Sequence, residues 1–332
     1  MILHASERQH PMEVLKNKLQ EDISKRNLPP LLDRNFIQTE DEADRVKFRI
    51  MQWNILAQAL TQGDDNFIRC PPEALKWDNR QLRVVEELVR FSPSILCLEE
   101  VDMFKFLTDT LGDAGYKGIF TPKPHSPCHK FVNNMGSDGC AVFYQTDMVE
   151  LLQHDSIVLR DEDNEETNQV SILCKFRLKS NKKVFYVSVC HLKAKAGFAT
   201  LRHQQGKYLL EVLKKRVGSH PVLICGDFNA SPKEPVYTEF IGSDLGLTSA
   251  YSQLTPARQE PKYTTWKIRG TNDGQTTESC KTIDYIWYST DKASITSVLD
   301  IPSPEVIGDA RLPSYSYPSD HFSLVCDVVI KS

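Results

Sequence analysis

Short apolar runs recur along the chain from about residue 46 to the end, and polar or turn-forming residues separate them. Several runs are apolar over most of their length, which is typical of strands that are covered on both faces. The runs read FRIMQWNIL, SILCLEEV, GCAVFY, VSILCKFRL, VFYVSVCHL, VLICGDF, TIDYIWYS and FSLVCDVVI. The pattern therefore predicts a sheet-rich fold whose strands are largely buried.

Two segments between these runs show the helical spacing of apolar residues. One begins near Pro72, and the other extends from about Phe198 to Val217. The apolar stripes consist of Leu75, Leu82, Val85, Leu88 and Val89 in the first segment and of Leu201, Tyr208, Leu209 and Val212 in the second. Because strands outnumber helices, we predict an α/β (α+β) fold with four layers in the order helix, sheet, sheet, helix.

The segments that connect the runs differ in length and character. The short polar segment from Lys179 to Lys182 indicates a hairpin, and the acidic run from Asp161 to Glu166 is better explained as a solvated hairpin tip than as a cation site. Residues 251–282 and 302–319 are expected to be irregular. Loops of that length are usually functional.

The first residues of the chain differ from the rest in being mostly polar. A helix is predicted from Pro11 to about Ser24, and Pro29 and Pro30 should prevent it from continuing. We expect residues 1–45 to form a peripheral, partly helical arm and residues 46–332 to form a single domain that carries the chemistry.

Composition narrows the classes of function. The formal net charge of −4 excludes a generally cationic coat for nucleic acid, so any polyanion must be bound by local patches or a metal ion. Most of the nine cysteines lie in apolar runs and none forms a Cys-x-x-Cys pair, which predicts a reducing compartment without structural disulfides. No stretch is apolar enough to span a bilayer. We expect a cytoplasmic protein, with a mitochondrial location for a longer form that carries a leader.

The strand VLICGDFNASP ends in a carboxylate and an amide. Asp227 and Asn229 are two residues apart, so in strand geometry they face the same way while Phe228 faces the core. Asp, Asn, Ser and Pro also favour ordinary turns, and an Asx turn closed by Ser231 and Pro232 is the simpler interpretation.

Other predicted strands also begin or end in polar residues that can take part in catalysis or metal binding. These are Asn54, Glu99, Glu100, His191, Asp284, Asp320 and His321. Each one alone has an ordinary structural explanation, such as a buried Asn, a surface Glu, a core His or a turn Asp. Together they favour a site for phosphoryl transfer, because that reaction depends mainly on positioning and on charge neutralisation.

Each residue type suits a particular role in such a site. Glu100 is a hard oxygen ligand for Mg²⁺, and Asp227 could orient and deprotonate a water molecule. His321, held by Asp284, would stabilise the phosphorane oxygen as an imidazolium. Donors to the developing charge would come from Asn54, His191 and Asn229.

The order of the motifs WN, LEE, HLK, GDFN, DYIW and SDH resembles the endonuclease/exonuclease/phosphatase superfamily, which includes DNase I, exonuclease III and the poly(A) deadenylases. The resemblance covers the chain from about Lys47 to Val329. It implies a DNase I-like sandwich of two mostly antiparallel sheets flanked by helices, with the metal site at one end. It further implies that Glu100 binds Mg²⁺, for which Mn²⁺ can substitute, with Asp320 and Asn54 nearby. The matching residues that complete the site are Asn54, His191, Asp227, Asn229, Asp284, Asp320 and His321.

Longer motifs, among them QWNILAQAL, HLKAKAGF, YTTWKIR and LPSYSYPSDHFSLVCD, resemble one branch of the superfamily. That resemblance implies hydrolysis of the 2′-phosphate of NADP⁺ and NADPH, which yields NAD⁺ or NADH and phosphate. The basic residues that it assigns to the dinucleotide are Lys123, Lys193, Lys195 and Arg269, with Asn229 also at the substrate. Without the resemblance, loop lysines are more simply explained as solvated surface charge.

Two positions depart from the superfamily pattern. Glu99 stands where Gln is common, and Leu56 stands where some nucleases have a carboxylate, which favours one Mg²⁺ over two. Because neighbouring residues of a strand face opposite ways, Glu99 is not expected to be a second ligand.

Two alternatives remain open. A poly(A)-specific 3′-exoribonuclease would use the same site, although the sequence has no long basic stripe with interleaved aromatic residues. A catalytically silent RNA- or protein-binding module is the other, and RNA is therefore a secondary candidate partner.

Overall fold

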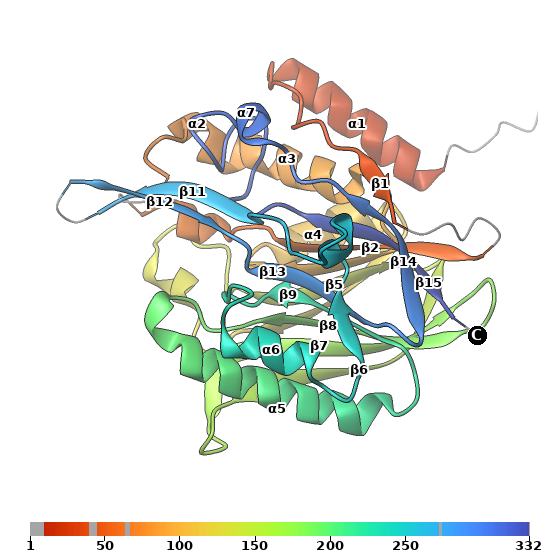
Figure 1. The fold of residues 1–332 in the computed structure, drawn as a ribbon. Helices are drawn as coiled ribbons and strands as arrows, with labels where there is room; N and C mark the ends of the chain where they lie inside the picture. Colours follow the sequence, from red (N-terminus) through yellow and green to blue (C-terminus); the bar gives the residue numbers. More distant parts are fainter. Residues whose placement is uncertain (1–9, 40–44, 64–66, 272–273, 332) are drawn as a thin grey trace, which may run out of the picture.

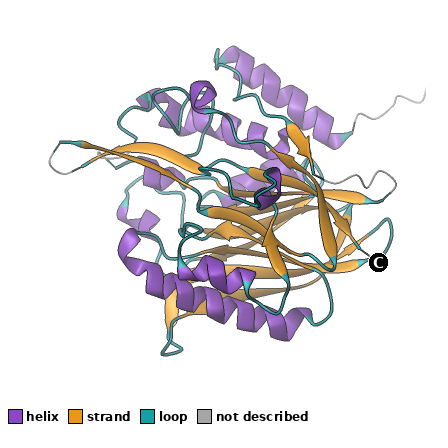
Figure 2. Cartoon of the chain, viewed as in Figure 1, coloured by secondary structure: helices purple, strands orange, loops and turns teal. Residues whose placement is uncertain are grey.

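The computed structural model describes residues 10–39, 45–63, 67–271 and 274–331. Two packed sheets form its centre, and helices cover their outer faces (Figures 1 and 2). The seven-stranded sheet has the order β1 (Phe36–Gln38), β14 (Ala293–Leu299), β15 (Leu324–Ile330), β2 (Lys47–Asn54), β3 (Ile95–Glu99), β5 (Gly139–Gln145) and β4 (Tyr116–Pro122). The six-stranded sheet has the order β10 (Leu247–Ser249), β13 (Asp284–Ser289), β9 (Val222–Asp227), β8 (Val184–His191), β7 (Glu166–Leu178) and β6 (Val149–Arg160).

Most neighbouring strands are antiparallel. The exceptions are the parallel pairs β2 with β3 and β8 with β9, each of which is connected through a helix as a parallel pair requires. The predicted α/β sandwich of mostly antiparallel sheets is therefore confirmed. The hairpin tips predicted at residues 161–166 and 179–182 connect β6 to β7 and β7 to β8, respectively.

Helices form the two outer layers. The outer face of the seven-stranded sheet is covered by α1 (Pro11–Lys25), α3 (Trp77–Arg90) and α4 (Phe104–Gly112), whose apolar residues share one cluster with that sheet. The longest helix, α5 (Ala199–Val217), and α6 (Pro235–Ile241) cover the six-stranded sheet in the same way. The short helices are α2 (Pro72–Leu75) and α7 (Pro304–Ile307).

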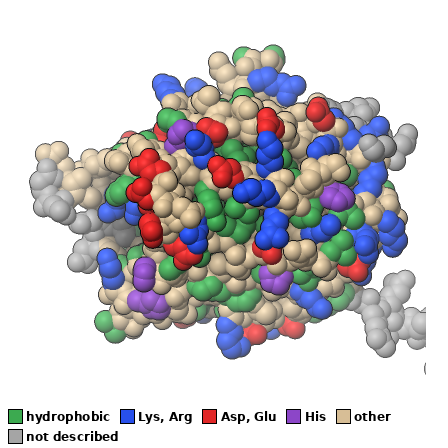
Figure 3. All heavy atoms as spheres, turned by 90° about the horizontal axis from the view of Figure 1, so that it is seen from below, with side chains coloured by type: hydrophobic (Ala, Val, Ile, Leu, Met, Phe, Trp, Pro, Cys, Tyr) green, Lys and Arg blue, Asp and Glu red, His purple; other side chains and the backbone are tan. Residues whose placement is uncertain are grey.

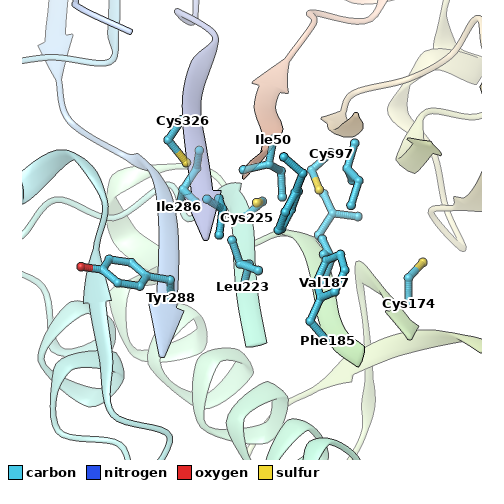
Figure 4. Packing of buried hydrophobic residues seen from close by; sticks show 14 of the residues in the cluster. Ile50, Cys97, Cys174, Phe185, Val187, Leu223, Cys225, Ile286, Tyr288 and Cys326 are labelled. Carbon is cyan, nitrogen blue, oxygen red and sulfur yellow. The ribbon is translucent and has the colours of Figure 1, made fainter. Parts of the chain in front are cut away.

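The central core lies between the two sheets and contains several cysteines (Figure 4). Cys97, Cys225 and Cys326 pack there with Ile50 and Leu223, all fully buried. All nine cysteines are free thiols, and only Cys280 is exposed. The buried cysteines therefore behave as small apolar core residues, as was predicted for those that lie in apolar runs.

The segment before β2 packs closely on the rest of the molecule. Helix α1 contacts α3, and β1 pairs with β14. Arg34 lies between these elements and forms a buried ion pair with Glu87 (3.2 Å). A separate arm formed by residues 1–45 stays a prediction.

One expectation about the loops was wrong. Residues 251–282 contain a hairpin, β11 (Thr265–Gly270) with β12 (Thr276–Lys281), which projects from the domain (Figure 1). Nearly all of β12 is exposed, and its sequence TTESCK has no apolar alternation. β12 is held by its ladder to β11 rather than by burial, so an apolar pattern could not reveal it.

Candidate active site

Strands from both sheets end at the same side of the sandwich. In the six-stranded sheet, His191 on β8 pairs in register with Asp227 on β9, which pairs with Asp284 on β13. Paired residues of adjacent strands project to the same face, so the three side chains form a row. In the other sheet, Asn54 ends β2 and Glu100 follows β3.

Asp227 lies at the centre of this arrangement and is almost fully buried. Its Oδ2 accepts a hydrogen bond from Asn54 Nδ2 (3.1 Å) and lies 3.5 Å from His191 Nε2 and 3.9 Å from His321 Nε2. Burial raises the pKa of Asp227 to about 7, against the opposing charge of His321. A carboxylate with a pKa near neutrality is well suited to act as a general base.

The GDFN segment combines the two interpretations that the sequence left open. Asn229 N donates to Asp227 Oδ1 (2.8 Å), and Asn229 has a left-handed backbone with φ 51°, so an Asx turn is present. Phe228 is buried under α5 and α6, as predicted. The turn orients the carboxylate, which leaves Oδ2 to face Asn54 and the histidines.

His321 and Asp284 form a hydrogen-bonded pair. His321 Nδ1 lies 3.0 Å from Asp284 Oδ2, which also accepts a bond from Thr264 Oγ1 (2.6 Å). Burial alone would lower the pKa of His321, but the surrounding carboxylates, Asp284 first, raise it to about 9. His321 is therefore an imidazolium at neutral pH. Burial instead keeps the pKa of His191 well below its usual value, so His191 is neutral.

Glu100 presents its carboxylate at the mouth of the site. Its backbone is left-handed (φ 54°), which turns the residue away from the direction of β3. Glu100 Oε1 accepts from Asn54 Nδ2 (3.1 Å), and Oε2 accepts from Ala57 N (3.3 Å). Since Asn54 Oδ1 accepts from Leu56 N, Asn54 directs its amide NH₂ into the site. A single carboxylate with room for water fits Mg²⁺, which retains several waters when bound to proteins.

Asp227, Asp284 and His321 also lie close enough together to hold a metal ion. The imidazolium charge and the bond from His321 Nδ1 to Asp284 oppose a cation there, so Glu100 is the better candidate ligand. Asp320 is also engaged: it is paired with Lys267 and lies 3.8 Å from Arg269. Despite burial, these cations lower the pKa of Asp320 far below its usual value, Lys267 most strongly.

Glu99 lies apart from the Glu100 carboxylate and is fully buried. Gln52 Nε2 donates to Glu99 Oε2 (2.9 Å), and Glu99 Oε1 has no hydrogen-bond partner among the described residues. Burial, followed by the charge of Asp284, raises its pKa well above the usual value. Burial thus favours the protonated carboxyl group at this position, where the superfamily pattern has an amide.

The predicted basic residues line one cleft of about 1700 Å³ together with Glu100, Asp227, Asn229 and His321. These basic residues are Lys123, Lys193, Lys195 and Arg269. Lys123 is ion-paired with buried Asp138 (2.6 Å), and Arg269 lies over the ring of Phe67. Sequence reasoning did not single out Lys267, which also lines the cleft. It lies two residues before Arg269 on β11, and this spacing was an available signal.

Arg80 is a second residue that sequence reasoning missed. It is buried beneath the site and donates to the carbonyl oxygens of Ile55 (2.9 Å), Leu56 (2.6 Å) and Pro318 (3.0 Å). It thereby connects the loop after Asn54 to the segment before Asp320. In sequence it is one arginine on an amphipathic helix, and nothing in the pattern distinguishes it.

Glu260 also lines the cleft, and the pH dependence of stability tests its shifted pKa. Burial raises its pKa from 4.5 to about 7, and Tyr237 donates to its Oε1 (2.9 Å). Native Glu260 therefore binds its proton more tightly than the unfolded chain does. Its contribution to stability is complete below pH 4.5 and is lost as the pH rises to about 7.

We expect Glu260→Gln, which cannot ionise and still accepts from Tyr237, to stabilise the fold at pH 8 by about 2–3 kcal/mol relative to its effect at pH 4.5. Urea unfolding at the two pH values measures this difference. The exposed Glu211→Gln is the matched control. An equal effect of Glu260→Gln at both pH values would show that Glu260 ionises normally.

Comparison with known proteins identifies the family to which this chain belongs. Residues 51–321 match the model of the endonuclease/exonuclease/phosphatase family, a span that contains every candidate site residue. The chain belongs to that family. Its members are hydrolases, and the family is metal-dependent.

Individual members of the family show closer similarity. Mouse nocturnin is 46% identical over 306 residues, which cover 90% of this chain and 70% of the mouse protein. Nocturnin of Drosophila melanogaster is 45% identical over 301 residues, which cover 84% of this chain but only 46% of that protein. The structure of the human nocturnin catalytic domain with bound sulfate anion superimposes with a TM-score of 0.76 at 38% identity, covering 91% of this chain and all of that one.

Among the described residues of this family member, no helix combines the length and the apolar character needed to cross a membrane.

Proposed function

We propose that the protein is a Mg²⁺-dependent phosphatase that removes the 2′-phosphate from NADP⁺ and NADPH. The observation that carries the proposal is the convergence of basic side chains on the cleft that also holds Asp227 and His321. They include Lys123, Lys193, Lys195, Lys267 and Arg269. A 2′-phosphomonoester beside a pyrophosphate concentrates charge within one small ligand, and a cluster of cations matches it.

Each side chain of the site has its own role in the hydrolysis. Asp227 accepts the proton of the attacking water, as its raised pKa favours. The imidazolium of His321 donates a hydrogen bond to the charge that develops on phosphorus-bound oxygen. Glu100 would hold Mg²⁺, which when bound supplies further charge neutralisation. The amide NH₂ of Asn54 lies between Glu100 and Asp227 and keeps the two carboxylates in fixed positions.

Two comparisons bear on the choice of substrate. The human nocturnin catalytic domain binds a sulfate anion, a tetrahedral anion like phosphate, which supports a phosphate subsite in a relative. The second candidate function, a 3′-exoribonuclease, is favoured by the Ccr4 exoribonuclease subunit of Debaryomyces hansenii, which is 28% identical over 332 residues. The lining of the cleft, however, includes the acidic Glu234 and Glu260 among its basic residues, whereas a binder of long single strands needs a continuous basic groove. Basic and acidic side chains are also interspersed on the face that carries α5 and α6 (Figure 3).

Removing one substrate-reading cation should weaken NADPH hydrolysis strongly. We expect Lys195→Ala or Arg269→Ala to lower kcat/KM. The expected loss of transition-state stabilisation is about 1–3 kcal/mol, the cost of a lost charge-assisted hydrogen bond. NADH should compete poorly, because it would leave these cations without the 2′-phosphate. Steady-state kinetics with NADPH measures both effects, and Lys214→Ala, on the outer side of α5 and paired with Asp244, is the control.

An exoribonuclease would give a different result in the same experiments. Its binding energy would come from contacts with many phosphates, so each single substitution would have a small effect. Binding of oligo(A) would then fall steeply with salt, in proportion to the number of phosphates contacted. Small effects of both substitutions together with a steep salt dependence would favour the second function.

A further inference from the structure

The loop between β8 and α5, residues 192–198, brings two of the proposed substrate-reading lysines to the cleft. Lys193 and Lys195 both line the cleft, and Lys193 Nζ lies over the ring of Phe198 (4.7 Å). The backbone of Lys195 has φ 81° and ψ 144°. A residue with a side chain rarely adopts this conformation because it is strained, and it persists only where surrounding contacts enforce it.

Arg202 supplies those contacts. It lies on α5, is 1% exposed, and its Nη1 donates to the carbonyl oxygens of both Lys193 (3.0 Å) and Lys195 (2.7 Å). One buried nitrogen therefore fixes two carbonyl groups on either side of Ala194. Because the guanidinium is planar and rigid, its orientation determines where both carbonyl groups lie.

Glu234 fixes the orientation of that guanidinium. Arg202 Nε and Nη2 donate to the same oxygen, Glu234 Oε2, at 2.9 Å and 2.7 Å. Glu234 immediately precedes α6, in the loop that follows β9 and Asp227, and it also lines the cleft. The Arg202–Glu234 pair thus connects the loop of the two lysines to the loop that follows the general base.

A second residue of α5 completes the support. Gln205, fully buried, accepts a hydrogen bond from Lys193 N (3.1 Å) and donates to Gln169 Oε1 (2.7 Å). Both backbone polar groups of Lys193 therefore have buried partners. The loop is built on a fixed polar framework, although the side chain of Lys195 is exposed.

We propose that Arg202, oriented by Glu234, is a positioning residue that determines where Lys193 and Lys195 present their charges. It would thereby set the selectivity of the site for ligands with more than one phosphate group. The substrate named in the test rests on the proposed function, whereas the role of Arg202 rests on the geometry of the loop. Arg202 borders the cleft but is only 1% exposed, so its proposed action is through the two lysines.

The test compares Arg202→Lys with the parent protein and with the same substitution in a background that lacks both lysines (Lys193→Ala with Lys195→Ala). Lysine keeps the charge but has three N–H donors on a single nitrogen, so it cannot reproduce the four bonds that Arg202 forms through three nitrogens. We expect Arg202→Lys to raise KM for NADPH about tenfold, with kcat within about threefold of the parent, since positioning a binding group affects mainly ground-state binding. In the background without the two lysines the same substitution should change KM less than about threefold, because Arg202 acts through them.

Two further variants and one binding probe distinguish a positioning role of Arg202 from a general effect on the protein. Glu234→Gln removes the charged partner of Arg202 but not the contacts of Arg202 with the two carbonyl groups. It should also raise KM for NADPH. This variant therefore tests the positioning role if Arg202→Lys does not fold. Arg216→Lys, on an exposed part of α5, should leave KM unchanged. Inorganic pyrophosphate is the probe that needs no turnover, and its Kd should rise in both Arg202→Lys and Glu234→Gln.

The failure of this inference differs from the failure of the proposed function. If the parent releases no phosphate from NADPH, the proposed function is wrong, and the Kd of pyrophosphate still tests Arg202. An unchanged Kd in the folded variants would overturn the positioning role. An equal rise of KM with and without the two lysines would also overturn it, because Arg202 would then act through general stability.

Discussion

Glu100→Gln is expected to abolish phosphatase activity while the fold stays intact. The amide has the shape of the carboxylate but is a poor ligand for Mg²⁺. The contribution of a catalytic metal is several kcal/mol, so turnover should fall by at least about a thousandfold. Kinetics at ordinary Mg²⁺ concentrations measures the loss, and calorimetric titration with Mg²⁺ should show that binding has weakened.

The exposed Glu73→Gln serves as the control, and thermal unfolding of Glu100→Gln should match that of the parent. The Glu100 variant retains an oxygen for the bond from Ala57 N, so no large loss of stability is expected. Turnover within about tenfold of the parent would remove Glu100 from the role of metal ligand.

Asp227→Ala and His321→Ala are each expected to lower kcat far more than they raise KM. Both residues act mainly in the transition state, and general acid–base groups contribute about 10²–10⁴-fold. Because Asp227 Oδ2 lies 3.9 Å from His321 Nε2 and each group shifts the pKa of the other, the double variant should lose much less than the sum of the single losses.

Single-turnover kinetics of the four proteins in this cycle measures the coupling. Asp227→Asn provides the structural control, because it retains an oxygen for the bond from Asn229 N but is a much weaker base. Additive losses in free energy would mean that Asp227 and His321 serve separate steps. A fully active Asp227→Asn would show that another group accepts the proton.

The central strands were predictable because burial on both faces leaves an apolar pattern. Runs such as residues 95–99 and 222–225 became β3 and β9 of the two sheets. Strands without that pattern were missed. β4 (YKGIFTP) is an edge strand and only partly buried, and β14 (ASITSVL) is rich in small polar residues. Edge and surface strands are determined by pairing with their neighbours, which a single sequence does not reveal.

The candidate site was predictable to the extent that chemistry lies at strand ends. Asp227, Asp284 and His191 come together because their strands are neighbours in register. The residues that support the surrounding loops were not predictable, since Arg80 and Arg202 act through contacts between segments distant in sequence. Each is an ordinary arginine on a helix until the fold places carbonyl groups around it.

The most direct test of the proposed function is one assay with two substrates. The protein is incubated with NADPH and with oligo(A), in Mg²⁺ and in chelator, and the release of phosphate and of AMP is measured. We predict rapid, Mg²⁺-dependent release of phosphate from NADPH with little AMP from oligo(A). Rapid Mg²⁺-dependent release of AMP from oligo(A), with no phosphate from NADPH by the same preparation, would contradict the proposal and establish the exoribonuclease instead.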